Sequence, residues 1–447
     1  MQKKQEQWSS KIGFILSSAG AAIGLGAIWK FPYMTGMNGG GAFFLLFIAF
    51  TVIIGLPILI AEFIIGRGAQ KEAVSAYKKL APNSLWTFIG KWGVVGAFLL
   101  MSFYSVVGGW VLIYSALSIP GLIIKDTANY PELFATITGS PFYTILGLAL
   151  FLLINIIVVS FGIQNGIEKS SKILMPLLFI FFIILVIRAV TFEGALEGIR
   201  FFLQPDFSKL NASNVLYALG QSFFSLAVGI SVMVTYSSYL KKDVSLPLSA
   251  SSVAVMGIFV SLLAGLAIFP VVFAFGLEPT EGPGLLFIVL PEAFAQMPFG
   301  EVFLSLFLLL FLFAVLTSSF SMLEIITAAF TEKKGRSRKK VASIAGILIF
   351  IAGIPAALSS NALADFKIFG LTIFDASDYL VSNIMLPGGC LFIALFIGYK
   401  MDKTLVKNEF SYGNNLSNGT YQVWFQLMRW LVPITIIFVF LGSVGIL

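Results

Sequence analysis

The chain has 447 residues, of which 58% are hydrophobic and only 11% charged, and its mean hydropathy is +0.97. Soluble proteins carry about 25% charged residues, so the composition indicates a membrane protein. The sequence contains no histidine and a single cysteine, Cys390. This excludes His-based acid/base triads, His/Cys metal sites and a disulfide framework. We interpret the net charge of +7 as an excess of basic residues in cytoplasmic loops rather than as a nucleic-acid-binding surface.

A membrane-spanning helix needs roughly 20 mainly apolar residues. We predict an all-α membrane protein with eleven such helices, at residues 11–35, 41–66, 88–121, 141–161, 164–189, 214–240, 248–277, 300–330, 341–357, 372–399 and 424–446. Residues 1–10 are interpreted as a short cytoplasmic tail. The shorter apolar stretch 282–297, which contains Glu292, is expected to form an outer loop helix or re-entrant cap. All loops are short, so the function must lie within the helix bundle.

The distribution of Lys and Arg predicts the orientation of the chain. With the N-terminus inside the cell, 22 of the 28 basic residues fall in cytoplasmic segments. Positive charge marks the cytoplasmic side, so we expect a multi-pass protein of the plasma membrane with its N-terminus cytoplasmic and its C-terminus outside. The basic run at 333–340 is interpreted as a solvated loop.

Two spans contain residues that disfavour a continuous helix. The first has three glycines, Gly20, Gly24 and Gly26, which are explained either by close packing against another helix or by a break in the helix. The sixth has a polar series from Gln221 to Ser225, followed by glycine. If spans one to five (11–189) and six to ten (214–399) are inverted repeats, breaks at corresponding positions indicate a transport site. Residues 400–447 would then form a cytoplasmic loop and the eleventh span.

Ionisable residues within spans are costly and suggest functional sites. Lys30 lies beyond the glycines of the first span, where it either snorkels to the surface or pairs with Asp375 or Asp378. Glu62 and Glu324 are interpreted as hydrogen-bonded structural carboxyl groups rather than proton carriers. The eighth span also contains Thr317-Ser318-Ser319, whose hydroxyls either bond to their own helix or serve as ligands for a hard cation.

Several of these residues, taken together, resemble a known family. The pattern comprises Trp8, residues 24–26 (GLG), 31–33 (FPY), 38–43 (NGGGAF), 66–67 (GR), 221–226 (QSFFSL) and 317–319 (TSS). In this collinear order it resembles the neurotransmitter:sodium symporter family, and within it the prokaryotic amino-acid transporters with eleven spans. The resemblance implies the leucine-transporter fold, a five-plus-five inverted repeat in which helices 1 and 6 are broken.

The resemblance also implies an amino acid site at mid-membrane. In it, the substrate carboxylate would meet the amides of Leu25 and Gly26 and the hydroxyl of Tyr104. The full set of implied substrate-binding residues is Ala21, Ala22, Leu25, Gly26, Leu100, Tyr104, Phe224, Ser225, Ala227, Ile230, Ser318 and Met322. This lining is almost wholly apolar, so we expect a hydrophobic or aromatic amino acid. Monoamine transporters of the family have an aspartate where this chain has Gly24, which also favours an amino acid.

Two sodium sites are implied by the family, and the sequence preserves one. The second site corresponds to Gly20, Ile23, Ala314, Thr317 and Ser318. The first site corresponds to Ala22, Ala27, Ser225 and Gly257, and is degraded because Ala27 and Gly257 replace the family's asparagines. We therefore expect sodium as the coupling ion, with one ion at the second site. Chloride is not expected, because Phe47 replaces the tyrosine of the family's chloride site, although Ser261 with Gln221 and Ser225 resembles part of it.

The resemblance further implies two gates. Lys30 and Asp378 would form the outer gate, with lysine in place of the family's usual arginine. The inner gate would comprise Trp8, Ser238, Tyr239, Glu324 and Glu332. Its usual basic partner is Gln5 here, and Lys4 is a doubtful substitute. Gly166 and Pro176 reproduce a spacing at which the fifth span unwinds, or else they are a loop glycine and a static kink.

These observations favour a sodium-driven symporter that imports an amino acid by alternating access. The alternatives are a sodium-independent facilitator or exchanger on the same fold and a non-transporting amino acid sensor. No nucleophile–base pair or metal cluster indicates an enzyme. We expect the partners to be the small-molecule amino acid and the lipid bilayer, with no nucleic acid and no obligate protein partner.

Overall fold

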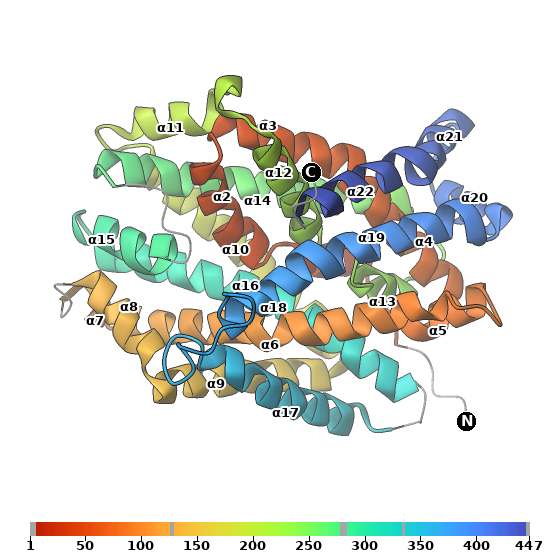
Figure 1. Ribbon diagram of the computed structural model, residues 1–447, viewed down its shortest axis with the longest axis horizontal. Helices are drawn as coiled ribbons and strands as arrows, with labels where there is room; N and C mark the ends of the chain where they lie inside the picture. The colour runs from red at the N-terminus through yellow and green to blue at the C-terminus, as the bar shows by residue number, and fades with distance from the viewer. Residues whose placement is uncertain (1–5, 126–128, 278–283, 333–335, 444–447) are drawn as a thin grey trace.

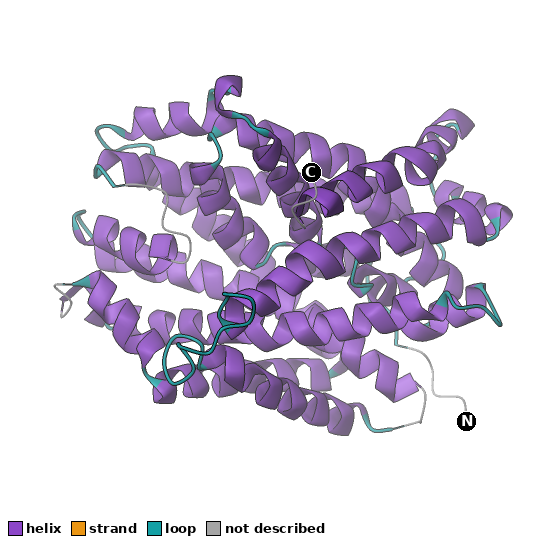
Figure 2. Ribbon diagram, in the orientation of Figure 1, coloured by secondary structure: helices purple, strands orange, loops and turns teal. Residues whose placement is uncertain are grey.

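The computed structural model describes residues 6–125, 129–277, 284–332 and 336–443. In these residues the chain is helical, and β-structure is limited to isolated bridges such as Gly40–Pro205 (Figure 2). Most of the long helices run along the long axis of the molecule (Figure 1). This arrangement confirms the predicted all-α architecture.

Nine helices in the described residues are long and apolar enough to cross a membrane. They are Gly41–Ala69 (α3, η2, α4), Thr87–Ser118 (α6), Pro141–Ser160 (α9), Ile163–Ala189 (η3, α10), Leu246–Ala274 (α14), Gly300–Thr331 (most of α16, Gly300–Glu332), Arg338–Ala357 (α17), Ile373–Lys400 (α18, η6, α19, η7) and Asn418–Gly442 (α21, η8, α22). A bent pair, α1 (Lys11–Ala22) with Gly26–Met37 (η1, α2), makes a tenth span broken by 52°. The chain is therefore a multi-pass membrane protein.

The predicted sixth span is also broken. It consists of α12 (Ala212–Leu226) and α13 (Val232–Ser238), separated by five non-helical residues. Ala227, Gly229 and Ser231 in this linker have positive φ angles of 50°, 93° and 56°, which a continuous right-handed helix does not contain. Since neither half alone is long enough to span a membrane, the predicted count of eleven spans remains a prediction.

The last span begins at Asn418 rather than at residue 424 as predicted. Two contacts explain the extra helix. Ser417 accepts a hydrogen bond from the Thr420 amide as an N-cap, and buried Trp424 donates to the Pro57 carbonyl at 3.1 Å. A prediction made from apolar stretches alone misses these polar first turns, although they belong to the helix.

Short helices connect the spans at both ends of the bundle. They are α5 (Ala73–Leu80), α7 (Leu122–Lys125), α8 (Tyr130–Gly139), α11 (Ala195–Leu203), η4 (Phe207–Lys209), η5 (Leu285–Val289), α15 (Leu290–Ala295) and α20 (Lys403–Ser411). The pair η5–α15 corresponds to the predicted loop helix 282–297, of which residues 282 and 283 lie outside the described residues. Figure 1 shows α5 and α20 at one end of the long axis and α7, α8, α11 and α15 at the other. We call these the Trp8 end and the Lys30 end, after the residues that close each one.

Candidate functional site

At the break in the first span, the backbone lies close to side chains of two other helices. A Cβ atom at Gly24 would lie 2.5 Å from the Tyr104 hydroxyl and 2.7 Å from the Ser318 Oγ. Only glycine fits there. The helix also ends close by, at Ala22, and a new one starts at Gly26. The two explanations of the glycines, close packing and a helix break, therefore both hold.

A cavity lies at this break, between α1, η1, α6, α12, α16 and α19. All of the residues that the resemblance assigns to the substrate line it, except Ser225. Gly24, Val232, Ser321 and Leu386 complete the wall, and of these only Gly24 was discussed from the sequence. Val232 and Leu386 were missed because nothing in an apolar span distinguishes a cavity-facing residue from a core residue.

One side of the cavity is polar. The Leu25 amide, freed by the helix break, donates to the hydroxyl of buried Tyr104 at 3.3 Å. On the opposite helix, the Ser318 hydroxyl donates to the Ala21 carbonyl at 3.0 Å. Amides at the start of a helix favour an anion, and carbonyls at the end of a helix favour a cation. The polar side is therefore suited to the two charged groups of a zwitterion.

The predicted ligands of the second sodium site come together on α1 and α16. A Cβ atom at Gly20 would lie 2.9 Å from the Thr317 Cβ, so the two helices touch there. Thr317 donates its hydroxyl to the carbonyls of Phe313 at 2.9 Å and Ala314 at 3.1 Å. Gly20 and Ile23 lie at the C-terminal end of α1, where carbonyls have no partner within the helix. Carbonyl and hydroxyl oxygens are the ligand type that hard cations prefer.

Gln221 forms two hydrogen bonds next to the residues of the implied first sodium site. Gln221 donates its Nε2 to the Gly26 carbonyl at 2.6 Å and to the Ser225 hydroxyl at 3.0 Å. Ala27 is buried and supplies no side-chain oxygen, and a Cβ at Gly257 would find only the Ser225 carbonyl, 3.9 Å away. Of the residues implied for this site, Ala27 and Gly257 thus offer no side-chain oxygen, and the Ser225 hydroxyl already accepts a hydrogen bond.

The neighbouring residues of the family's chloride site differ in their packing. The Ser261 hydroxyl is buried and has no hydrogen-bond partner among the described residues. Phe47 instead packs its ring 5.0 Å from that of Phe31 and presents no hydroxyl. The part of the site that a tyrosine would supply is therefore apolar.

An ion pair closes the Lys30 end. Lys30 Nζ lies 3.2 Å from the Asp378 carboxylate, donates to Ser382 at 3.1 Å, and lies 5.0 Å from the centre of the Phe224 ring. Asp375 instead lies in the first turn of its helix, where its carboxylate accepts a hydrogen bond from the N-cap residue Thr372 at 2.6 Å. Lys30 therefore pairs with Asp378, and does not simply extend to the surface.

Hydrogen bonds of the N-terminal tail close the Trp8 end. Trp8 donates its indole N–H to the Tyr236 carbonyl at 2.8 Å and its backbone N–H to the Tyr239 carbonyl at 3.2 Å. Tyr239 in turn donates its hydroxyl to buried Glu324 at 2.7 Å. Ser238, which the resemblance placed in this gate, donates instead to Thr235 of its own helix at 2.7 Å.

The basic residue of this gate is Arg338, which the sequence interpretation of 333–340 as a solvated loop missed. Arg338 forms a two-point ion pair with Glu324 and lies 3.5 Å from the Glu6 carboxylate. The interpretation was wrong for Arg338 because α17 begins there and turns the side chain inward. Gln5 and Lys4 lie outside the described residues, as does the side chain of Glu332 at the end of α16.

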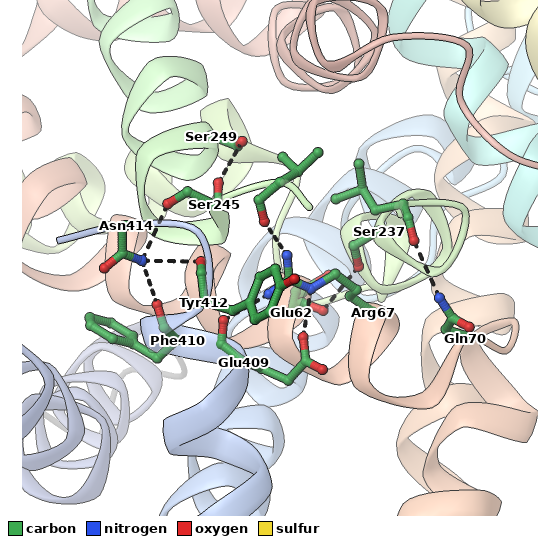
Figure 3. A network of polar contacts seen from close by, with 12 residues as sticks. Glu62, Arg67, Gln70, Ser237, Ser245, Ser249, Glu409, Phe410, Tyr412 and Asn414 are labelled. Carbon is green, nitrogen blue, oxygen red and sulfur yellow. Dashed lines mark hydrogen bonds and ion pairs between the residues drawn. The ribbon is translucent and has the colours of Figure 1, made fainter. Parts of the chain in front are cut away.

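Helix α4 braces the second break. Glu62 accepts hydrogen bonds from the Gly229 amide at 2.7 Å and the Val234 amide at 3.3 Å, as expected for a structural carboxylate. One turn further, fully buried Arg67 pairs with Glu409 of α20 at 2.5 Å (Figure 3). The same helix therefore holds both the unwound linker and the short helix at the Trp8 end.

The predicted unwinding residues lie at the start of the fifth span. Gly166 is inside the π-helical segment η3 (Ile163–Glu168), and a side chain there would overlap the Val158 carbonyl. It is therefore not a loop glycine. Pro176 lies inside α10 (Lys169–Ala189) and removes one helix hydrogen bond.

A multi-pass helical bundle with two broken helices and a cavity beside the breaks has the features expected of a secondary transporter. Residues 5–128 and 139–446 match the model of the Sodium:neurotransmitter symporter family, and the chain belongs to this family. It is a family of transporters and not of enzymes.

Two curated relatives are similar over the whole chain. An uncharacterized sodium-dependent transporter of Bacillus subtilis (strain 168), YhdH, is 50% identical over 100% of this chain and 99% of its own length. An uncharacterized sodium-dependent transporter of Haemophilus influenzae is 39% identical over 99% of this chain and 98% of its own length. The crystal structure of MhsT in complex with L-phenylalanine is 41% identical, has a TM-score of 0.92 and covers 98% of this chain and 100% of the MhsT chain. The leucine-transporter fold expected from the resemblance is thereby confirmed.

Proposed function

We propose that this protein is a sodium-coupled symporter that moves a hydrophobic or aromatic amino acid by alternating access. The cavity at the break of the first span carries the proposal. Its polar side, Leu25 and Tyr104, faces an apolar remainder that includes Leu100, Ile230 and Met322. The polar side binds the backbone groups common to amino acids, while the apolar remainder rejects charged side chains because they would be buried without a partner. The complex of MhsT with L-phenylalanine supports this substrate class.

Sodium is proposed to bind at the second site and to be the only coupling ion. Gly20 and Thr317 bring α1 and α16 together there, next to the substrate cavity. Of the residues implied for the first site, the Ser225 hydroxyl already accepts a hydrogen bond from Gln221, and Ala27 and Gly257 supply no side-chain oxygen. One sodium moving with a zwitterion carries one charge, worth about 2.3 kcal/mol per 100 mV. We propose that chloride is not required.

The contacts at the Lys30 end and at the Trp8 end correspond to a state that is closed at both ends. The cavity volume open to water is only about 20 Å³, and one water needs about 10–15 Å³. Substrate entry therefore requires the wall to move. We propose that the Lys30 end faces outward and opens through the Lys30–Asp378 pair, and that the Trp8 end faces the cytoplasm and opens through the Glu324–Arg338 pair, in line with the positive-inside distribution of basic residues.

Uptake of radiolabelled amino acids into proteoliposomes, with sodium, lithium or potassium outside, tests the proposal. We expect uptake with sodium and not with potassium. Thr317→Ala is expected to abolish the sodium dependence, while Thr317→Ser, which keeps the hydroxyl, retains it. Uptake indifferent to the cation would defeat the symporter and favour a facilitator or exchanger, for which the absence of both asparagines from the implied first site is the supporting observation. Binding without uptake would favour a sensor.

A further inference from the structure

A line of contact runs along α1 from the Trp8 end to the second sodium site. At its outer end, a side chain on Gly13 would overlap the Glu168 carboxylate. At its inner end, a Cβ at Gly20 would lie 2.9 Å from Thr317 and 3.3 Å from the Met175 sulfur. These two glycines mark the stripe of α1 that faces α10 and α16.

Two serines lie on this line between the marked positions. Ser17 is four residues after Gly13 and three before Gly20, which places it on the same face of α1. On α10, Ser171 is three residues after Glu168 and four before Met175, and so shares the face that meets α1. The two serines therefore occupy the facing stripes at matching heights.

Both serine hydroxyls are buried without a partner. Each residue is 1% exposed, and neither Oγ has a hydrogen-bond partner among the described residues. Many hydroxyls in the spans bond to their own helix, as Ser237 does to Met233 and Ser249 to Ser245. A buried hydroxyl that does not is a vacant oxygen ligand.

Glu168 ends the line with a buried carboxylate, 1% exposed. In the closed state it holds the N-terminal tail, accepting hydrogen bonds from the Ser9 amide at 2.8 Å, the Ser9 hydroxyl at 2.5 Å and the Ser10 hydroxyl at 3.2 Å. Lys172 pairs with it at 2.7 Å. When the tail moves away while α1 stays packed on α10, Glu168 loses the three tail contacts and keeps, among the described residues, only the ion pair with Lys172.

We infer that Ser17, Ser171 and Glu168 form a transient sodium site on the way from the second sodium site to the Trp8 end. It rests on the proposed function, because it assumes that sodium leaves from Thr317. Two hydroxyls and a carboxylate are oxygen ligands of the kind that hard cations prefer. The carboxylate is capped by the tail in the closed state and uncapped when the tail leaves, so the site forms when the ion must depart.

The test measures sodium affinity and sodium release separately in the purified full-length protein. Ser17→Ala and Ser171→Ala each remove one oxygen, and Ser17→Cys and Ser171→Cys do so at nearly constant volume. Ser18→Ala is the matched control: Ser18 is also buried with an unpartnered hydroxyl, but lies on another face of α1. Equilibrium sodium affinity comes from sodium titration of substrate binding, and release is followed by stopped-flow dilution of sodium.

We expect each Ser17 or Ser171 variant to keep its equilibrium sodium affinity and to release sodium about tenfold more slowly, the loss expected for one missing oxygen contact. Ser18→Ala should match the wild type in both. Wild-type release rates in the Ser17 and Ser171 variants, an equal slowing in Ser18→Ala, or a lowered equilibrium affinity like that of Thr317→Ala would each overturn the transient site. If the wild type itself shows no sodium dependence, the proposed function fails, which is a distinguishable result.

Discussion

Gln221 Nε2 lies 3.0 Å from the Ser225 hydroxyl, one of the oxygens that the family resemblance assigns to the first sodium site. Its other hydrogen bond, at 2.6 Å, is to the carbonyl of Gly26, the residue before Ala27. The absence of asparagine at Ala27 and Gly257 is thus accompanied by a hydrogen-bond donor on Ser225. This relationship links the sequence of the site to the proposed use of a single sodium ion.

Restoring the two asparagines should restore sodium binding at the first site. We predict that Ala27→Asn combined with Gly257→Asn raises the cooperativity of sodium activation, because two amide oxygens are added where space beside Gly257 is open. The measurement is uptake against sodium concentration. Wild-type activation should be hyperbolic and the double variant sigmoidal. An unchanged hyperbolic curve in a variant that still transports would contradict the interpretation of the first site as degraded.

The Tyr104 hydroxyl is predicted to bind the substrate carboxylate. Tyr104→Phe removes one hydrogen bond to a charged group, worth about 1.5–3 kcal/mol, and should weaken amino acid binding roughly tenfold to a hundredfold. Equilibrium binding of the substrate to purified protein at saturating sodium measures this. Leu100→Ile, which changes only the apolar wall, is the control and should alter selectivity among substrates more than overall affinity. Equal binding by Tyr104→Phe and the wild type would remove Tyr104 from the site.

At the Trp8 end, removing Arg338 should be worse than removing the whole ion pair. Arg338→Gln leaves Glu324 buried without its basic partner, and breaking a buried pair in this way costs about 3–5 kcal/mol. We expect a lowered melting temperature. The double variant Arg338→Gln with Glu324→Gln should recover much of the stability. A double variant less stable than Arg338→Gln would show that the pair is not coupled in this way.

At the Lys30 end the expected effect is smaller. The Lys30 and Asp378 side chains are 20% and 34% exposed, so solvent screens the pair and its loss should cost about 1 kcal/mol or less. Lys30→Gln should therefore reduce uptake by roughly twofold to fivefold while leaving equilibrium binding nearly unchanged. The charge reversal Lys30→Asp with Asp378→Lys should recover part of the rate. Loss of all binding in Lys30→Gln would mean that Lys30 contacts the substrate rather than gating it.

The sequence predicts the bundle well, because apolar stretches long enough to cross a membrane are a direct signal. Span boundaries were accurate where composition changes abruptly, as at Gly41 and Pro141. The start of the last span at Asn418 was missed because its first turns are polar and are stabilised by contacts with distant residues. Of the short loop helices, only η5–α15 was predicted, because its sequence is apolar, whereas helices such as α5, α8 and α20 begin at polar N-cap residues outside any apolar stretch.

The candidate site, like the fold, could be predicted from the sequence only in part. Glycine spacing and the family motifs indicate where the backbone breaks, and therefore which residues meet at the cavity. They do not indicate that a residue from a basic run, with the composition of a surface loop, pairs with a buried carboxylate. Arg338 is one of six basic residues at 333–340, and only the fold shows that its guanidinium turns inward to Glu324. Likewise, Gln221 could be recognised as a polar residue in a span, but not as the residue that donates to the Gly26 carbonyl and to Ser225.

The most direct test of the central claim is the sodium-to-amino-acid flux ratio in proteoliposomes. It can be measured from the sodium gradient and membrane potential at which net amino acid flux reverses. The account predicts one sodium ion per amino acid, with the ratio set by the Thr317 site alone. A measured ratio of two would contradict the single-site account and would require a second ion beside Gln221 and Ser225.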